Sequence, residues 1–99
     1  MKGYVARAMK AGLAREGEPA LLAGAACGNV VVQRSVQAEP GMLGRADDNY
    51  VARFDLALID AEFDPRVGQV LVHPDGTFRL DRLVDDNGVV RRFIVVRAQ

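Results

Sequence analysis

The strongest indication of the fold is Phe63-Asp64-Pro65-Arg66-Val67-Gly68 together with the residues that follow it to Arg97. Three short apolar runs follow this stretch, separated by His73-Pro74-Asp75-Gly76 and by Asp85-Asp86-Asn87-Gly88. Proline sets its own φ near the value that the second position of a turn needs, and glycine takes positive φ without steric cost, so both clusters indicate chain reversals. The sequence therefore predicts a three-stranded antiparallel meander over residues 69–72, 77–84 and 89–97.

The clearest single strand lies upstream of the meander, at residues 50–59. Apolar side chains recur there at every second position, and this period predicts that the even-numbered residues face the core. One core is therefore expected to contain residues from this strand and from the meander. Its predicted members are Phe54, Leu56, Leu58, Phe78, Leu80 and Phe93.

The first third of the chain predicts one helix and two more strands. Strong helix formers with apolar residues at i, i+4 and i+8 predict an amphipathic helix at 2–16, which ends at Gly17 because glycine suits the left-handed position after a helix. Such an arm either docks on the sheet or stays mobile. Strand candidates follow at 20–25 and 29–36, and Gly28 is expected to turn the chain between them.

These elements predict a mainly β (α+β) fold, a small antiparallel β barrel or sandwich of about six strands with one N-terminal helix. The chain of 99 residues is long enough for one small core, so we expect a single domain at 1–99. It consists of a helical arm at 2–16 and a β domain at 20–97. Residues 37–49 show no periodicity and are rich in turn formers, which predicts a long surface loop.

Charge and cysteine usage argue against several functional classes. Lys and Arg total 13 and Asp and Glu total 13, so the chain lacks the basic excess that nucleic-acid binding needs. One cysteine rules out an intramolecular disulfide and fits a reducing compartment, which indicates the cytoplasm. No apolar stretch reaches the length of about 18 residues that a membrane helix requires, so we expect no membrane partner.

No residue pattern predicts catalysis, a cofactor or a metal. The only histidine, His73, is expected to be a solvent-facing turn residue, and Cys27 a small buried hydrophobe. Acidic residues at 81–87 lack the spacing of a calcium loop and predict a polar hairpin turn instead. Arg91 and Arg92 are adjacent in a strand and therefore face opposite sides, so they do not form one basic patch.

The order of parts resembles the small head-tail joining proteins, also called head-completion or neck proteins, of lambda-like tailed phages. The similar features are an N-terminal arm, a first strand near 29–32, a long acidic and glycine-containing loop and a strand at 54–59. An Asp-Pro-Arg-x-Gly turn at 64–68, the run 69–72 and a closing hairpin complete the similarity. The chain departs from the family's Asp-Gly-x-x-Tyr-x-Val segment, because it has Asp75-Gly76-Thr77-Phe78-Arg79-Leu80 there. Phe78, one position before the family's tyrosine, could fill the aromatic position.

The resemblance implies a structural protein of a phage or prophage virion that is not an enzyme and carries no cofactor. Its implied partners are a portal-side neck protein of the head and the tail-terminator protein. It implies a monomer when free and a ring in the virion neck, after assembly in the host cytoplasm. The alternative is a small β-barrel binding module for nucleic acid or a regulatory partner.

Within the predicted loop, Met42, Leu43 and Arg45 are the candidate partner-binding residues. Met42 and Leu43 stand between Gly41 and Gly44, and a surface loop displays two apolar side chains for a partner or folds them onto its own core. The guanidinium of Arg45 can pair with a carboxylate of a partner.

Overall fold

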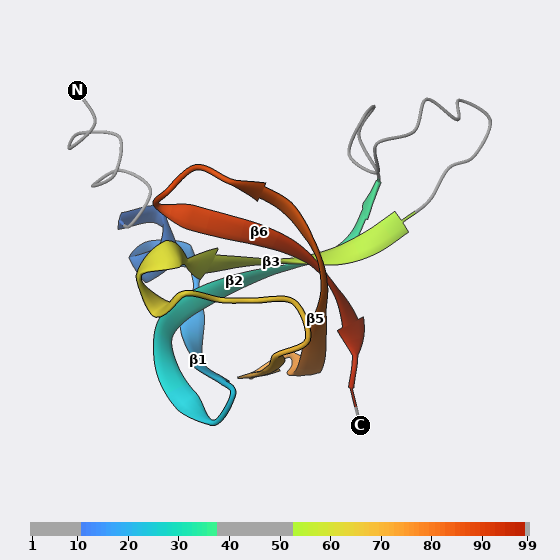
Figure 1. Cartoon of the computed structure of the whole chain (residues 1–99), viewed down its shortest axis with the longest axis horizontal. Helices are drawn as coiled ribbons and strands as arrows, with labels where there is room; N and C mark the ends of the chain where they lie inside the picture. The colour runs from blue at the N-terminus through green and yellow to red at the C-terminus, as the bar shows by residue number, and fades with distance from the viewer. Residues whose placement is uncertain (1–10, 38–52, 99) are drawn as a thin grey trace.

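The structure is a computed structural model that describes residues 11–37 and 53–98 (Figure 1). Residues 11–16 are helical, and a 3-10 turn, η1 (Ala61–Phe63), follows the third strand. Within this part of the chain the strands are β1 (Glu18–Leu22), β2 (Ala25–Gln37), β3 (Arg53–Asp60), β4 (Val70–His73), β5 (Gly76–Asp86) and β6 (Val90–Arg97).

The strands form one closed antiparallel barrel in the order β1-β2-β3-β6-β5-β4. Two long strands make closure possible, because each pairs with one neighbour along its first part and with another along its second. Strand β2 pairs with β1 up to Val30 and with β3 from Val31 onward. Strand β5 pairs with β4 up to Arg79 and with β6 from Phe78. The predicted mainly β fold with an N-terminal helix is confirmed, and of the two predicted forms, barrel or sandwich, the structure has the closed six-strand antiparallel barrel.

The barrel interior is filled by aliphatic and aromatic side chains from all six strands. Phe78, Leu80 and Phe93, three of the predicted core residues, lie fully inside it. The buried cluster consists of Ala20, Leu22, Cys27, Val30, Ala57, Ile59, Leu71, Phe78, Leu80, Phe93 and Val95.

The face of β3 that points into the barrel was predicted wrongly. Ala57 and Ile59, at odd positions, belong to the interior cluster, whereas Leu56 and Leu58 lie on the other face of the strand. Leu56 is fully buried there, at 1% exposed, so its predicted burial is confirmed although its predicted face is not. Leu58 lines a hollow together with Leu13 of the helical segment, so apolar residues on the outer face are also covered. Both faces of β3 are therefore apolar, and the larger residues on the outer face misdirect the period-two argument.

Phe54 also lies outside the interior cluster, and it is half-buried at the start of β3. It pairs with Val36 near the end of β2, beyond the bulge at which the β2–β3 register shifts. The expectation that Phe54 belongs to the same core as Phe93 was wrong. The barrel interior begins further along β3, at Ala57.

The chain reverses between β1 and β2 at Ala23 and Gly24, and not at Gly28 as the sequence predicted. Gly28 has φ 72° inside β2, where three residue steps of β2 face two of β1. An extra residue of this kind is a β-bulge, which bends the strand and favours glycine because φ is positive. The prediction of a turn at Gly28 was therefore wrong, and the positive φ of this glycine bends a long strand.

The meander at the C-terminal end of the chain is confirmed. His73 pairs with Gly76 across the two-residue turn Pro74-Asp75, and Gly76 has φ 141°. Gly88 has φ 83° in the turn between β5 and β6. The turn chemistry predicted from proline, aspartate, asparagine and glycine thus sets the register of three strands.

The described part of the helical segment, residues 11–16, packs against the barrel. Leu13 is buried, and Asn29 donates a hydrogen bond from Nδ2 to the carbonyl oxygen of Ala14 at 3.0 Å. Gly17 is not among the described residues with positive φ; a Cβ there would lie 2.6 Å from the Leu13 carbonyl oxygen and 3.0 Å from the Val30 nitrogen. Lack of space, not a left-handed conformation, therefore explains this glycine. In the described ranges no helix is long and apolar enough to cross a membrane.

Candidate functional site

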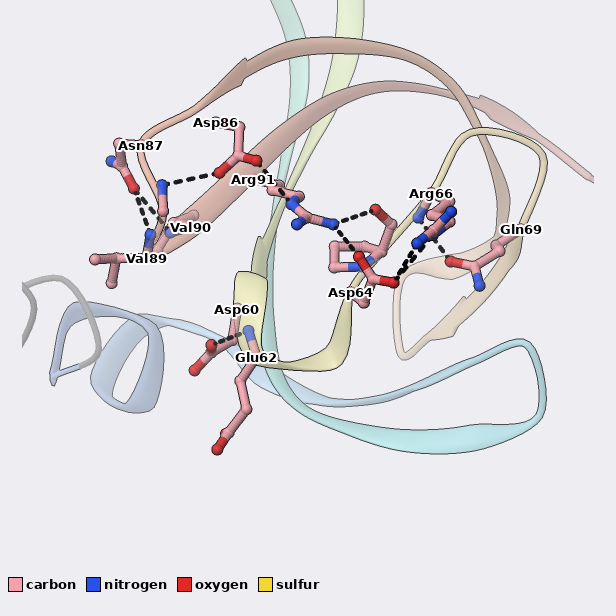
Figure 2. A network of polar contacts seen from close by, with 12 residues as sticks. Asp60, Glu62, Asp64, Arg66, Gln69, Asp86, Asn87, Val89, Val90 and Arg91 are labelled. Atoms are coloured by element: carbon pink, nitrogen blue, oxygen red, sulfur yellow. Dashed lines mark hydrogen bonds and ion pairs between the residues drawn. The ribbon is translucent and has the colours of Figure 1, made fainter.

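A network of hydrogen bonds and ion pairs surrounds the Asp-Pro-Arg turn (Figure 2). Asp64 ends η1 in a left-handed conformation, with φ 49° and ψ 54°, and its N–H donates to the carbonyl oxygen of Ala61. Its carboxylate accepts hydrogen bonds from two arginines, from Arg91 Nη1 to Oδ1 at 2.7 Å and from Arg66 Nη2 to Oδ2 at 2.8 Å. The hydrogen bonds from Arg91 and then from Arg66 lower the pKa of the Asp64 carboxyl below its ordinary value.

Arg91 connects this turn to the β5–β6 turn. Its Nη1 also donates to the carbonyl oxygen of Pro65 at 3.0 Å, and its Nε donates to Asp86 Oδ2 at 2.9 Å. The hydrogen bond to Asp64 is the largest cause that raises the pKa of the Arg91 guanidinium. The planar guanidinium thus joins three acceptors from two loops, and only arginine provides donors in this fork geometry.

Beyond the proline, the turn leads directly into the barrel. Pro65 is fully buried, and the N–H of Arg66 donates to Gln69 Oε1 at 2.8 Å. Gly68 donates to the carbonyl oxygen of Leu80 at 2.7 Å and fixes the approach to β4. Each residue type of this motif therefore has a structural role, and the motif closes one corner of the barrel without exposing a reactive group.

The acidic cluster at the β5–β6 turn also uses its oxygens within the fold. Asp86 Oδ1 accepts from the N–H of Gly88, and Asn87 Oδ1 accepts from those of Val89 and Val90, each at 2.9 Å. Across residues 11–37 and 53–98, no three His, Cys, Asp or Glu side chains form a group that could hold a metal ion. The predicted polar hairpin turn is confirmed as the structure of this cluster.

His73 is buried, with 7% of its surface exposed, so the prediction of a solvent-facing turn residue was wrong. The N–H of Asp75 donates to its Nδ1 at 3.1 Å, and its Nε2 lies 3.0 Å from the carbonyl oxygen of Val30. Nδ1 therefore acts as the acceptor and the proton resides on Nε2, which donates to Val30. The imidazole ring links the β4–β5 turn to β2, because each of its nitrogens forms a hydrogen bond with a backbone group.

Cys27 is confirmed as a buried small hydrophobe. It is 1% exposed, and its Sγ lies 3.5 Å from the carbonyl oxygen of Ala20. Burial raises the pKa of the Cys27 thiol, which keeps it protonated and unreactive as a nucleophile at neutral pH.

Arg91 and Arg92 point to opposite sides of β6, as predicted. While Arg91 binds Asp64 and Asp86, Arg92 donates from Nη2 to Asp85 Oδ2 at 2.7 Å. Further along the strand, the guanidinium of Arg97 lies 5.2 Å from the centroid of the Phe78 ring. These basic side chains are thus engaged by acidic or aromatic groups of the same molecule.

The candidate partner-binding residues Met42, Leu43 and Arg45 lie outside the described residues. The strand ends on either side of these residues are described. We call the stem the paired end of β2 and start of β3, where Val36 pairs with Phe54 and Gln37 with Arg53; it extends from the barrel (Figure 1). Here Ser35, with φ 56°, donates its N–H to Asp55 Oδ1 at 2.9 Å, and Arg53 Nη1 donates to the Ser35 carbonyl oxygen at 3.0 Å. Both backbone groups of a strained residue are therefore satisfied, and the stem has a defined conformation.

Another surface, which the sequence interpretation did not identify, covers the outside of β1 and β4. Leu21 of β1 pairs with Ala26 on β2 and with Val72 on β4, and Val72 pairs with Thr77 on β5. Residues directly opposite each other in a sheet point to the same side, so this row crosses four strands. Leu21, Val70 and Val72 are 43%, 40% and 45% exposed. We call Leu21, Ala26, Val70 and Val72 the β1–β4 face.

A signal for this face was present in the sequence. Residues 19–28 and 67–74 contain no Asp, Glu, Lys or Arg, in a chain of which 26% is charged. Strands β1 and β4 bring these two uncharged runs side by side, and the N–H of Ala23 donates to the carbonyl oxygen of Val70. Pairing of two strands far apart in the sequence is not visible from either run alone.

A hollow of about 360 Å³ lies between the helical segment and the wall formed by β2, β3 and β6. Leu13, Val31, Leu58 and Val90 provide its apolar lining, and Arg92 lies at its polar side with Asp85. Its size falls in the range of small-molecule sites. Its charged lining consists of Glu16, Asp85 and Arg92. Arg92 Nη2 is paired with Asp85 Oδ2 at 2.7 Å, whereas Arg92 Nε is buried without a hydrogen-bond partner among the described residues.

No known protein-family model matches this chain, and a search of curated proteins finds no match either.

Proposed function

We propose that this protein is a structural protein of a phage or prophage virion, which joins the DNA-filled head, at its portal side, to the tail by protein–protein binding. The observation that carries the proposal is the two-stranded stem of β2 and β3. It extends from a closed barrel and carries residues 38–52, among which Met42, Leu43 and Arg45 are the proposed contact residues (Figure 1).

The barrel supports this role by its rigidity. Closure pairs each strand with a neighbour on both sides, and the clasp of Arg91 with Asp64 and Asp86 fixes one corner. A connector has to hold its binding segments at fixed positions between two large assemblies. A stem rooted in such a barrel meets this requirement with few residues.

The environments of His73 and Cys27, the single histidine and the single cysteine of the chain, support binding and not catalysis. Both ring nitrogens of His73 bind backbone groups of the protein itself, and the thiol of Cys27 is buried with a raised pKa. A nucleophile and its base must reach a substrate, so neither group is placed for an enzyme mechanism. We therefore propose a non-enzymatic protein without a cofactor.

Charge pairing supports a role beside DNA without binding it. Arg66, Arg91 and Arg92 each form an ion pair of 2.7–2.9 Å with an aspartate of the same chain. Affinity for a nucleic acid depends on basic groups that release counterions from phosphates. Arginines that are already paired with aspartates contribute little to this counterion release. Weak affinity for DNA suits a protein that borders a channel through which DNA has to move.

Deletion of the gene from its own genome tests the proposal. We expect filled heads and complete tails to accumulate separately, and purified protein added to the lysate to restore infectious particles. The double variant Met42→Ser, Leu43→Ser should fail to restore them while its melting temperature stays unchanged. Normal particle yield after deletion, or specific binding of the purified protein to single-stranded nucleic acid at physiological salt, would overturn the proposal.

A further inference from the structure

We propose that the β1–β4 face is a second binding surface, and that its occupant is an apolar, uncharged surface of a different virion protein and not a second copy of this chain. This inference rests on the proposed function and adds a partner surface to it. The face is defined by Leu21, Ala26, Val70 and Val72, none of which belongs to the stem or to the clasp.

The apolar side chains of this face are contiguous. Leu21 lies directly opposite both Ala26 and Val72, and Val70 lies two residues before Val72, on the same side of β4. Isolated exposed hydrophobic residues are common on protein surfaces, whereas contiguous ones indicate an interaction site. The row continues into Thr77, which is also uncharged.

The chemistry of the partner follows from the missing charges. Burying an unpaired charge against an uncharged surface costs free energy, because the charge loses water and gains no counterion. Two uncharged runs, 19–28 and 67–74, form this side of the barrel. A matching partner surface must therefore be apolar or neutral where it contacts Leu21 and Val72. Arg79, which pairs with Val70 across β4 and β5, provides a polar boundary.

The extent of the face argues against a self-association site. A stable dimer buries about 800 Å² on each partner, whereas this face offers four small or medium side chains. Contacts of this size hold only when several are made together, as when copies of the protein meet an already assembled ring. The occupant is therefore a repeated subunit of an assembly, which explains why free molecules need not associate.

The position of the face also suits a second partner. Strand β2 connects the two surfaces, because its first residue, Ala25, follows the β1–β2 turn and its last, Gln37, ends the stem. The two ends of β2 lie on different sides of the molecule (Figure 1), so surfaces placed there are accessible to two different partners. A molecule that joins a head to a tail requires such an arrangement.

The test uses the deletion lysate, to which purified variants of the full chain are added. We expect Val72→Glu and Leu21→Glu to restore particles at least about 30-fold less efficiently than wild type at limiting protein, the loss that a hot-spot residue gives. The matched control is Leu83→Glu, because Leu83 is equally exposed, at 43%, but lies on β5 away from the face. The control should restore particles as wild type does.

Each outcome separates this inference from the proposed function. If wild type itself fails to restore particles, the proposed function is wrong. If wild type and Val72→Glu restore particles equally, the β1–β4 face is not a binding surface. If wild type forms dimers or larger species by sedimentation, and Val72→Glu abolishes them, the occupant is a second copy and the inference is wrong. Should a glutamate variant melt early, Val72→Thr, which keeps the shape of the side chain, replaces it in the same assay.

Discussion

The four phenylalanines of the chain provide an internal scale for the barrel core, and replacing each by alanine tests the fold quantitatively. Phe78 and Phe93 are fully buried in the interior cluster, and Phe54 is half-buried in the stem. Phe63 is 41% exposed and lies over Gly28, where a Cβ would be 3.4 Å from its Cε2. The same chemical change therefore samples three degrees of burial.

The expected destabilisation follows from transfer and cavity formation. Emptying a buried aromatic site costs about 3–5 kcal/mol, so Phe93→Ala should lower the free energy of unfolding by that amount. For Phe63→Ala we expect about 1 kcal/mol, since solvent fills the space and no cavity remains. Phe54→Ala should fall between the two. One kcal/mol shifts the melting temperature of a domain this small by about 4–8 °C, so Phe93→Ala should melt at least about 12 °C below wild type.

Urea unfolding followed by circular dichroism gives these free energies, and thermal melts provide an independent check. A core substitution of this size approaches the whole stability of a small domain, which is about 5–15 kcal/mol. Phe93→Leu, expected to cost about 1 kcal/mol, is therefore measured beside it. If Phe63→Ala costs as much as Phe93→Ala, or if Phe93→Ala leaves the transition unchanged, the assignment of the barrel interior is wrong.

Three further outcomes are expected. The pKa of the Asp64 carboxyl is lower in the folded protein than in the unfolded one, so this carboxylate stabilises the fold fully at pH above the unfolded pKa and no longer does so once pH falls below the folded pKa. Asp64→Asn should therefore reduce the loss of folding free energy at acidic pH. If that loss is unchanged in the variant, the clasp of Arg91 with Asp64 is contradicted. The thiol of Cys27 should react with a thiol reagent only at the rate of unfolding, and fast labelling of the native protein would show that the residue is accessible. Gly17→Ala should destabilise more than Gly12→Ala, because a Cβ at 17 meets the carbonyl oxygen of Leu13 whereas nothing lies within 4 Å of one at 12; equal melting temperatures would refute this packing.

Much of the barrel could be predicted from local sequence signals. Turn residues fix the β4–β5 and β5–β6 hairpins, because Asp75-Gly76 and Asn87-Gly88 have few alternatives to chain reversal. The β-branched run at 30–32 likewise indicates a strand on its own. These signals depend on residues near each other in the chain, so no knowledge of the tertiary structure is needed to use them.

The predictions that were wrong, the inward face of β3 and the exposure of His73, depend on contacts between segments that are distant in the sequence. Ala57 faces the interior, where it pairs with the buried Phe93 of β6, and Leu58 lines the hollow that the helical segment with Leu13 borders. The period of two in β3 gives the alternation but not its direction. His73 was misplaced for a related reason, since its burial depends on the carbonyl oxygen of Val30, 43 positions earlier in the chain.

The candidate surfaces differ in how far the sequence could reveal them. The Asp-Pro-Arg turn stands out as a motif, yet the structure assigns its polar groups to the clasp, so prominence in the sequence did not indicate a binding site. The β1–β4 face has no motif, and its signal is the absence of charge in two separate runs that pair only in the barrel. A surface that binds a protein through apolar contacts contains few charged residues. Uncharged runs in the sequence therefore indicate such a surface only when the strand pairing that brings them together is known. The pairing of Leu21 with Val72 is the contact that converts two neutral stretches into one surface, and substituting either residue tests it directly.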